Sequence, residues 1–283
     1  MDLKEKKALL VGIGKWGKVL ANILINKGYK VSYITRDKNP NLSFEKIFRT
    51  NSLQYFSYKD EIHFDLVLIA VKPIDFYDAW KEYKIYSNKF LIEKPGALNK
   101  NQIKMMFLEA FNEGKSILIN YEYIYTGESI LLLNKLIGKK KDIKEISIIW
   151  EKKLNEYGNL NWRLLPHLIA DLLIISKENL IFKKSQIEKD SIKLMGIINN
   201  AKFYLEFNNK EKSFYQNKIK LFNEEVFIKE RNKLFLDNKM IYNKQILSVD
   251  NMVDLSQTAS KEVIHLNNKL AFDVLDIMEK INV

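Results

Sequence analysis

The 283-residue sequence predicts an α/β fold in two domains. Residues 1–120 are expected to form a doubly wound parallel sheet, and residues 121–283 an α+β domain with a mainly antiparallel sheet. Two observations predict this division. Short apolar runs alternate with helical patterns up to about residue 120, which is typical of right-handed strand–helix–strand crossovers. From about residue 190 to 247, apolar and polar residues alternate one by one, as in strands with one wet face.

In the first domain, each predicted strand is a short buried run followed by a helix or a turn. The run at residues 65–71 (DLVLIAV) is apolar on both faces, as strands of a parallel sheet are. The other predicted strands are residues 7–11, 29–35, 90–92 and 116–119, with helices after residue 14 and over residues 100–112.

The second domain is predicted from a change in periodicity. Residues 201–207 (AKFYLEF) show the clearest period-two alternation. Leu270, Val274, Leu275 and Met278 form one apolar stripe in a C-terminal helix, residues 267–281, which can pack back on the first domain. The remaining predicted elements are helices over residues 129–136 and 163–176 and a strand over residues 144–150.

Composition and charge exclude several classes of protein. The chain has no cysteine, so disulfides, thiolate metal sites and cysteine nucleophiles are excluded, and its three histidines are too far apart in sequence to predict a metal site. The net charge is +11, but the lysines are scattered and are not interleaved with aromatic residues, so no nucleic-acid partner is predicted. The positive field instead favours an anionic small molecule.

No segment predicts membrane insertion or export. The longest apolar stretch, residues 164–175, is interrupted by His167 and Asp171 and is shorter than the ~20 residues that a membrane span needs. The N-terminus contains no apolar core of signal-peptide length. We therefore expect a cytoplasmic protein without a membrane partner.

A glycine pattern follows the first predicted strand and opens the first predicted helix. In Gly12-x-Gly14-x-x-Gly17, the first glycine permits a tight turn, the second lets the backbone approach a pyrophosphate, and the third brings the helix against the strand. The free N–H groups of the helix N-terminus then face the phosphates. This context predicts a Rossmann dinucleotide-binding domain, with a structural glycine turn as the alternative.

The residues after the second strand predict which dinucleotide binds. An acid about 20 residues past the glycine pattern accepts hydrogen bonds from the ribose of NAD. Here Thr35 and Arg36 occupy that place, and a hydroxyl with a guanidinium suits the 2′-phosphate of NADP. NADP is therefore favoured, and NAD remains the alternative because Asp37 follows closely.

Three short motifs, together with the glycine pattern, resemble a known family. Val71-Lys72-Pro73 ends one core strand, Glu93-Lys94-Pro95 ends the next, and Leu165-Pro166-His167 begins a helix of the second domain. In this order and spacing they resemble the glucose–fructose oxidoreductase and inositol dehydrogenase family (Gfo/Idh/MocA). The resemblance extends over the whole chain.

This resemblance implies an NAD(P)-dependent oxidoreductase that transfers a hydride between the nicotinamide cofactor and a sugar or nucleotide-sugar-like substrate. It implies that Lys94 orients cofactor and substrate, that His167 exchanges a proton, that Glu93 steadies the loop, and that a cis peptide precedes Pro95. It also implies a homo-oligomer, with the antiparallel sheet as the contact face. The cofactor-binding residues are then Gly12, Gly14, Lys15, Trp16, Gly17, Thr35, Arg36, Val71, Lys72, Pro73, Glu93 and Lys94, and the substrate-binding residues Lys94, Tyr121, Glu122, Arg163, His167 and Asp171.

The sequence departs from the family pattern at three places. Arg163 stands where the family commonly has an Asp, Glu122 stands where it usually has an Arg, and Asp171 comes four rather than three residues after His167. Glu122 and Arg163 are expected to line the cleft between the domains as an exchanged charge pair. The departures keep two alternatives open: a reductase of a C=N or C=C bond in a non-sugar molecule, and a dinucleotide-binding sensor or scaffold without turnover.

Overall fold

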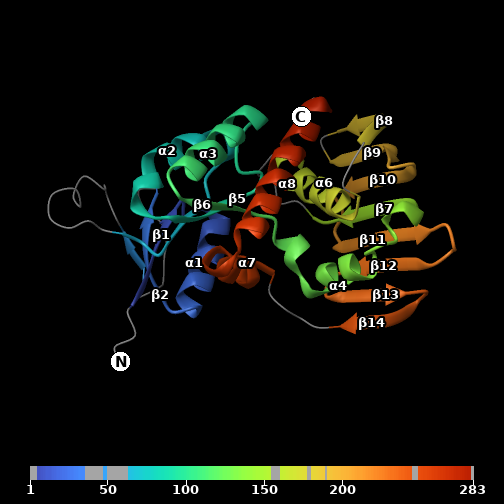
Figure 1. Ribbon diagram of the computed structural model, residues 1–283, viewed down its shortest axis with the longest axis horizontal. Coiled ribbons are helices and arrows are strands. Elements are labelled where there is room, and N and C mark those ends of the chain that lie inside the picture. Colours follow the sequence, from blue (N-terminus) through green and yellow to red (C-terminus); the bar gives the residue numbers. More distant parts are fainter. Residues whose placement is uncertain are drawn as a thin grey trace. The chain divides into compact units, whose positions relative to one another are not determined.

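The computed structural model describes residues 5–35, 47–49, 63–153, 160–176, 180–188, 190–243 and 248–281. The chain divides into two compact units (Figure 1). Unit 1 consists of Met1–Asn120 and Val249–Asp276, and unit 2 of Tyr121–Ser248 and Ile277–Val283. Residues 249–276, which the sequence analysis assigned to the second domain, thus lie with the first.

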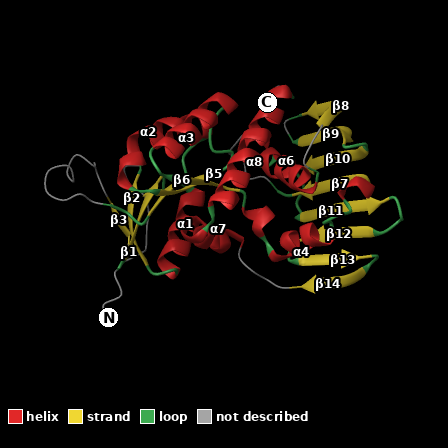
Figure 2. Ribbon diagram, viewed as in Figure 1, coloured by secondary structure: helices red, strands yellow, loops and turns green. Residues whose placement is uncertain are grey.

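Unit 1 contains a six-stranded sheet in which every pairing is parallel (Figure 2). The strand order is β3-β2-β1-β4-β5-β6, so the order reverses between β1 and β4. This is the doubly wound arrangement that the alternating pattern predicts, with a crevice at the carboxyl ends of β1 and β4. The strands are β1 (Lys6–Val11), β2 (Tyr29–Ile34), β3 (Ile47–Arg49), β4 (Leu66–Ile69), β5 (Lys89–Glu93) and β6 (Ser116–Asn120).

Helices accompany this sheet, and their ends follow local sequence signals. The helix predicted over residues 100–112 is confirmed. It begins after Asn99 because the Asn99 side chain accepts a hydrogen bond from the Gln102 N–H at 3.0 Å and caps the first turn. The C-terminal helix begins six residues earlier than predicted, at Lys261, and another helix that the sequence analysis missed precedes it. The helices are α1 (Lys15–Asn26), α2 (Phe76–Tyr83), α3 (Lys100–Asn112), α7 (Ser248–Thr258) and α8 (Lys261–Lys280), with 3₁₀ turns η2 (Pro73–Asp75) and η3 (Lys84–Tyr86).

The outer edge of β6 is covered by the side chain of Asn267, which lies in α8. Its Oδ1 accepts a hydrogen bond from the Ile119 N–H at 2.7 Å, and its Nδ2 donates one to the Ile119 carbonyl at 3.0 Å. Both residues are buried. The amide thus pairs with β6 as a neighbouring strand would, and it closes an edge that would otherwise expose unpaired backbone groups.

Replacing Asn267 with alanine is expected to destabilise the protein. Two buried backbone groups of Ile119 would lose their partner, and leaving such groups unsatisfied costs about 1–3 kcal/mol. The free energy of unfolding from denaturant titration measures this loss. Asn268→Ala is the matched control, because the neighbouring amide oxygen has no hydrogen-bond partner among the described residues. Equal losses in the two variants would contradict a specific role for Asn267.

Unit 2 contains an eight-stranded sheet in the order β14-β13-β12-β11-β7-β10-β9-β8. The pairing of β7 with β10 is parallel and the other pairings are antiparallel, so the mainly antiparallel sheet of the prediction is confirmed. The sequence analysis missed β8, because polar residues occupy both of its faces. The strands are β7 (Ile143–Glu151), β8 (Leu180–Ile187), β9 (Ser191–Ile198), β10 (Ala201–Asn208), β11 (Phe214–Leu221), β12 (Val226–Glu230), β13 (Lys233–Leu236) and β14 (Lys239–Asn243).

The helical segments of unit 2 include α4 (Gly127–Lys135), α5 (Leu160–Arg163), α6 (Leu165–Ile175) and the 3₁₀ turns η4 (Glu122–Tyr125) and η5 (Lys140–Asp142). The helix predicted over residues 163–176 is confirmed as α6, which begins two residues later than predicted. Leu164 separates it from α5, and Pro166 lies in its first turn. Nine of the eleven residues of α6 are buried, including His167 and Asp171. Across the described part of the chain, we find no helix with the length and apolar character needed to cross a bilayer.

Candidate active site

The glycine turn lies at the carboxyl end of β1, where the strand order reverses. Gly12 has a φ of +93°, and a Cβ atom there would lie 2.4 Å from the carbonyl oxygen of Ala70, next to the end of β4. A Cβ on Gly17 would lie 2.2 Å from the carbonyl oxygen of Gly12. Both positions therefore need glycine for the fold itself.

Gly14 differs from the other two glycines, because a Cβ atom there would meet nothing within 4 Å. Gly14 is the N-cap of α1, its backbone is extended, and it offers no capping side chain. The first turn of α1 contains Lys15 and no acid. The free N–H groups at this open helix end thus suit a pyrophosphate, which is the fit that a dinucleotide cofactor requires.

The three glycines can be separated by experiment. Gly14→Ala is expected to keep wild-type stability and to lose most of its cofactor affinity, because the new methyl group enters only the space open to the phosphates. Gly17→Ala is expected to destabilise the fold as well, because of its clash with Gly12. Cofactor titration by fluorescence and thermal unfolding measure the two effects. Unchanged affinity in Gly14→Ala would place the phosphates elsewhere.

Glu93 connects the glycine turn with the ends of two strands. Its Oε1 accepts hydrogen bonds from the indole N–H of Trp16 at 2.6 Å and from the Asn120 side chain at 2.5 Å. Burial raises the pKa of Glu93, while the bond from Asn120, the charge of Lys94 and the bond from Trp16 act in the opposite direction. Glu93 thus holds the start of α1, the end of β5 and the end of β6 together, which is the steadying role that the resemblance implies.

Lys94 follows directly after β5, at the carboxyl edge of the parallel sheet, and its side chain is half-buried. The Lys94–Pro95 peptide bond is cis. Val71 and Pro73 are half-buried and Lys72 is exposed in the segment that follows β4, at the same edge of the sheet. Unit 1 therefore brings its predicted cofactor residues to one edge, including Thr35 after β2, while Arg36 lies outside the described residues.

His167 lies in the first turn of α6, among the aromatic side chains of unit 2. The Tyr123 ring is 4.8 Å away, centroid to centroid, and Trp150 and Tyr121 are at 6.0 and 6.4 Å. The Tyr121 hydroxyl and the Trp150 indole nitrogen are buried and have no hydrogen-bond partner among the described residues. Burial raises the pKa of Tyr121, so its hydroxyl remains a proton donor for hydrogen bonds.

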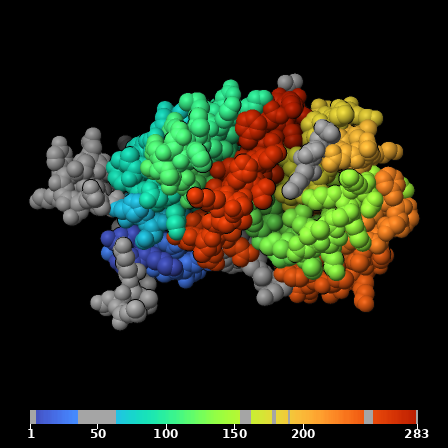
Figure 3. Space-filling model, viewed as in Figure 1, coloured from blue at the N-terminus to red at the C-terminus, as the bar shows by residue number. Residues whose placement is uncertain are grey.

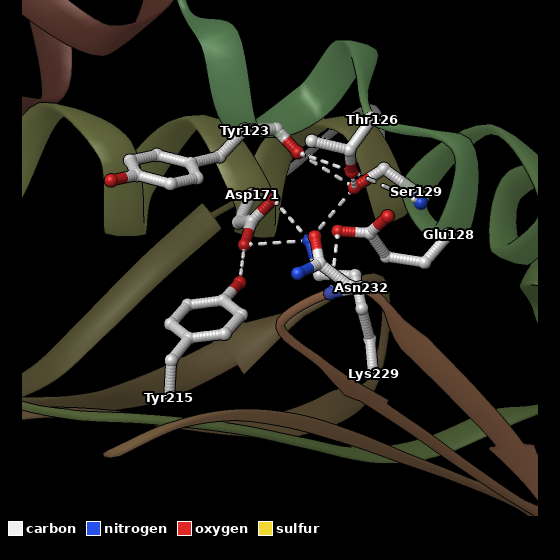
Figure 4. Close-up of polar contacts among 8 residues, drawn as sticks. All are labelled: Tyr123, Thr126, Glu128, Ser129, Asp171, Tyr215, Lys229 and Asn232. Carbon is white, nitrogen blue, oxygen red and sulfur yellow. Dashed lines mark hydrogen bonds and ion pairs between the residues drawn. The ribbon is translucent and has the colours of Figure 1, made fainter. Parts of the chain in front are cut away.

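Asp171 lies one turn after His167 and has partners within the protein (Figure 4). Both of its carboxylate oxygens are 2.9 Å from the Nζ of Lys229, and the Tyr215 hydroxyl donates to one of them. Lys229 also donates to the Ser129 hydroxyl at 3.1 Å. The Lys229 and Asp171 side chains are only 3% and 2% exposed, so these contacts hold α6 against β11, β12 and α4 from inside unit 2.

Asp171 was predicted from the sequence as a site residue, whereas its partners Lys229 and Tyr215, and Ser129, were not. A signal for Lys229 exists in the alternation of β12, where Phe227 and Lys229 share the buried face. A lysine at an inward position of a half-buried strand needs a buried acid. Nothing local, however, indicates which acid that is.

The remaining predicted residues lie at the start of unit 2. Glu122 is buried in η4, and Arg163 is exposed at the end of α5. Tyr121 precedes Glu122 at the first position of unit 2. Lys94 belongs to unit 1 and His167 to unit 2, so their joint action stays a prediction. Among the described residues, no cluster of three or more His, Asp or Glu side chains could hold a metal ion.

Comparisons with known proteins agree with this architecture. Residues 7–93 match the model of a family described as NADP oxidoreductase, coenzyme F420-dependent. Solved structures of similar fold include the dehydrogenase MviM from Clostridium difficile (10% identity, TM-score 0.76), with 98% of this chain and 99% of that chain covered. The fold is that of the Gfo/Idh/MocA dehydrogenases.

Two further solved structures of similar fold carry information on ligands. One is named for its substrate, and the other was solved with ligands bound. UDP-N-acetylglucosamine 3-dehydrogenase GnnA from Acidithiobacillus ferrooxidans is 11% identical with a TM-score of 0.76, over 99% of this chain and 97% of that chain. The WlbA dehydrogenase from Thermus thermophilus, in complex with NAD and UDP-GlcNAcA, is 11% identical with a TM-score of 0.74, over 96% and 94%. A comparison of the sequence with curated proteins found no significant match. The resemblance seen in the sequence is thereby confirmed for the fold.

Proposed function

We propose that the protein is an oxidoreductase that transfers a hydride between a nicotinamide dinucleotide and a sugar or nucleotide-sugar-like substrate. The observation that carries this proposal is the glycine turn at the reversal of the strand order, with its open helix N-terminus at Gly14 and with Glu93 and Lys94 on the same edge of the sheet. The named activity of GnnA and the ligands of WlbA support the choice of a nucleotide sugar.

Different residues of the chain have separate roles in the proposed reaction. Gly12, Gly14 and the first turn of α1 bind the pyrophosphate, and Lys94 binds and orients the reacting oxygen of the substrate. When bound, the nicotinamide gives or accepts the hydride. His167 exchanges the proton of the substrate oxygen, which a reaction at a carbinol or carbonyl carbon requires. The Tyr121 hydroxyl and the Trp150 N–H, which have no hydrogen-bond partner among the described residues, suit sugar hydroxyls, which both donate and accept hydrogen bonds.

The proposed cofactor is NADP rather than NAD. Thr35 and Arg36 follow β2 without an intervening acid, and a charge-assisted contact of Arg36 with the 2′-phosphate would contribute ~1.5–3 kcal/mol, roughly ten- to a hundredfold in affinity. Wild-type protein is therefore expected to bind NADPH more tightly than NADH in fluorescence titrations, and Arg36→Ala is expected to abolish that difference. Equal affinities in the wild type would refute the preference for NADP, and an unchanged preference in the variant would refute its assignment to Arg36.

A substrate panel tests the reaction itself. Purified protein is incubated with oxidised and reduced forms of both cofactors, and absorbance is followed with UDP-sugars and their keto forms, with imines and with enones. Turnover of the sugars supports the proposal. Turnover confined to imines or enones supports a C=N or C=C reductase. Cofactor binding without any turnover, with the same cofactor affinity in Lys94→Ala as in the wild type, supports a sensor.

A further inference from the structure

Unit 1 contains a groove that none of the proposed catalytic residues line. It lies between the second half of α3 and the first half of α8, with the turn that leads into β6 at its end, and its volume is about 820 Å³. The two helices belong to the face seen in Figure 3, where α3 is green and α8 is red. A cavity of this size is within the range of about 300–1,000 Å³ found for small-molecule sites.

Two contacts fix α8 beside α3 and β6. Asn267 holds α8 to the edge of β6, and Lys100 at the start of α3 forms an ion pair with Asp276 in α8 at 2.6 Å. The helices are thus tied together where α3 begins, and the groove opens where α3 ends. None of the residues that form these contacts lines the groove.

The walls of the groove are apolar and its rim is basic. Phe107, Leu108, Phe111, Ile264 and Phe272 supply the apolar lining, and Phe111 and Leu108 are 82% and 58% exposed. The cations that line it are Lys104, Lys115, Lys261 and Lys269. No acidic residue is among the described residues that line it.

Two of these four lysines are available to a ligand. Lys115 pairs with Glu113 and Lys269 with Asp273, each at 2.9 Å. Lys104 and Lys261 form no ion pair within the described part of the chain, and they come from opposite walls of the groove. A ligand with one anionic group and an apolar body could pack its body on the apolar walls and pair its anionic group with one of these lysines.

The groove is separate from the proposed dinucleotide site. α3 leads into β6, so the end of α3 lies at the amino edge of the parallel sheet. Gly12, Glu93 and Lys94 follow strands and lie at the carboxyl edge. The cofactor and the substrate therefore do not explain the groove.

A second copy of the chain is also a poor occupant. A symmetric dimer places the same patch of each copy against the other, so it would bring Lys104 and Lys261 of one groove against the same two lysines of its partner. Like charges at such a contact are unfavourable. The chain as a whole carries +11, which adds to this repulsion.

We propose that the groove between α3 and α8 binds a single-chain anionic amphiphile, with the alkyl chain on Phe107, Phe111 and Phe272 and the carboxylate on one of the two lysines without an ion pair, Lys104 or Lys261. The probe is dodecanoate, kept below its micelle concentration and titrated by calorimetry into the full-length protein. We expect saturable binding of one molecule per chain. Dodecylamine has the same chain with the opposite charge, and it is expected not to bind.

Variants place the binding in this groove. Lys104→Gln with Lys261→Gln is expected to weaken dodecanoate binding by about tenfold or more, since the charge-assisted contact is lost whichever of the two lysines makes it. Lys202→Gln with Lys218→Gln, which removes the same charge from exposed positions of unit 2, is the matched control and is expected to bind as the wild type does. Leu108→Gln is expected to weaken binding without changing the charge.

Four results would overturn the proposal. These are equal binding of dodecanoate and dodecylamine, wild-type affinity in Lys104→Gln with Lys261→Gln, no saturable binding at all, and oligomers that Phe111→Lys converts to monomers. The last result would make the groove an interface between copies. Displacement of dodecanoate by cofactor would likewise contradict the separation of the two sites.

Discussion

Lys94→Ala is expected to lower kcat by about 10²–10³-fold on the true substrate, which is the usual loss when one group that stabilises a reacting oxygen is removed. Cofactor affinity is expected to change little, because the glycine turn and the open N-terminus of α1 remain intact. Single-turnover kinetics together with fluorescence titration of the cofactor separate the two effects.

The matched control is Lys72→Ala. Lys72 also follows a core strand at the carboxyl edge of the sheet, but it is exposed, whereas Lys94 is half-buried. The control is expected to affect KM more than kcat. Near-native turnover in Lys94→Ala would show that the chemistry depends on other residues, and equal losses in both variants would indicate a general effect of positive charge.

The parallel sheet of unit 1 could be predicted from the sequence because its signals are local. The run at residues 65–71 is apolar on both faces, and Gly12, Gly14 and Gly17 require one particular turn. Their roles follow from backbone sterics, which do not depend on distant parts of the chain. Asn99 likewise caps α3 through a contact three residues away.

The elements that were missed depend on distant contacts. β8 is polar on both faces and is defined by its pairing with β9. The first part of α8 belongs to unit 1 because Asn267 reaches Ile119, which is 148 residues earlier in the chain. Period and composition contain no information about such partners. The sequence therefore predicted only that an apolar stripe of the C-terminal helix can pack on the first domain, and it did not predict α7.

The candidate site shows the same difference between local and distant signals. The position of Glu93 at the end of β5 could be predicted, whereas its contacts with Trp16 and Asn120 could not. In unit 2, Asp171 was named as a substrate residue from its spacing to His167. In the structure, the Asp171 carboxylate has partners on two strands, Tyr215 on β11 and Lys229 on β12. Neither pairing could be predicted from the sequence.

The buried pair of Lys229 and Asp171 leads to the largest expected effect on stability. Lys229→Met is expected to lower the free energy of unfolding by about 3–5 kcal/mol, because it leaves the carboxylate of Asp171 buried without a counter-charge. The exposed pair of Lys153 and Glu211 has a similar N–O distance, 2.8 Å, with side chains 58% and 79% exposed. Lys153→Met is the matched control, and its effect is expected to be barely measurable since water screens that pair.

The loss in Lys229→Met is expected to depend on pH. Burial raises the pKa of Asp171, and Lys229 opposes this rise in the wild type, so the pKa of Asp171 is higher still in the variant. A carboxyl whose pKa is higher in the folded than in the unfolded state binds more protons when folded. Its folded form is therefore favoured at low pH and loses stability as pH rises through the folded pKa. The variant is accordingly expected to be closest to the wild type in acid and to fall further behind toward pH 8.

A double variant distinguishes the loss of a charge partner from a simple loss of packing. Lys229→Met with Asp171→Asn removes both charges, while the new amide oxygen can still accept the Tyr215 hydroxyl. We expect it to be more stable than Lys229→Met alone, because no uncompensated charge remains inside unit 2. Denaturant unfolding of the wild type, the two single variants and the double variant measures the coupling. Strictly additive losses, with the same pH dependence in all variants, would show that the methylenes of Lys229 stabilise α6 and that its ion pair with Asp171 does not.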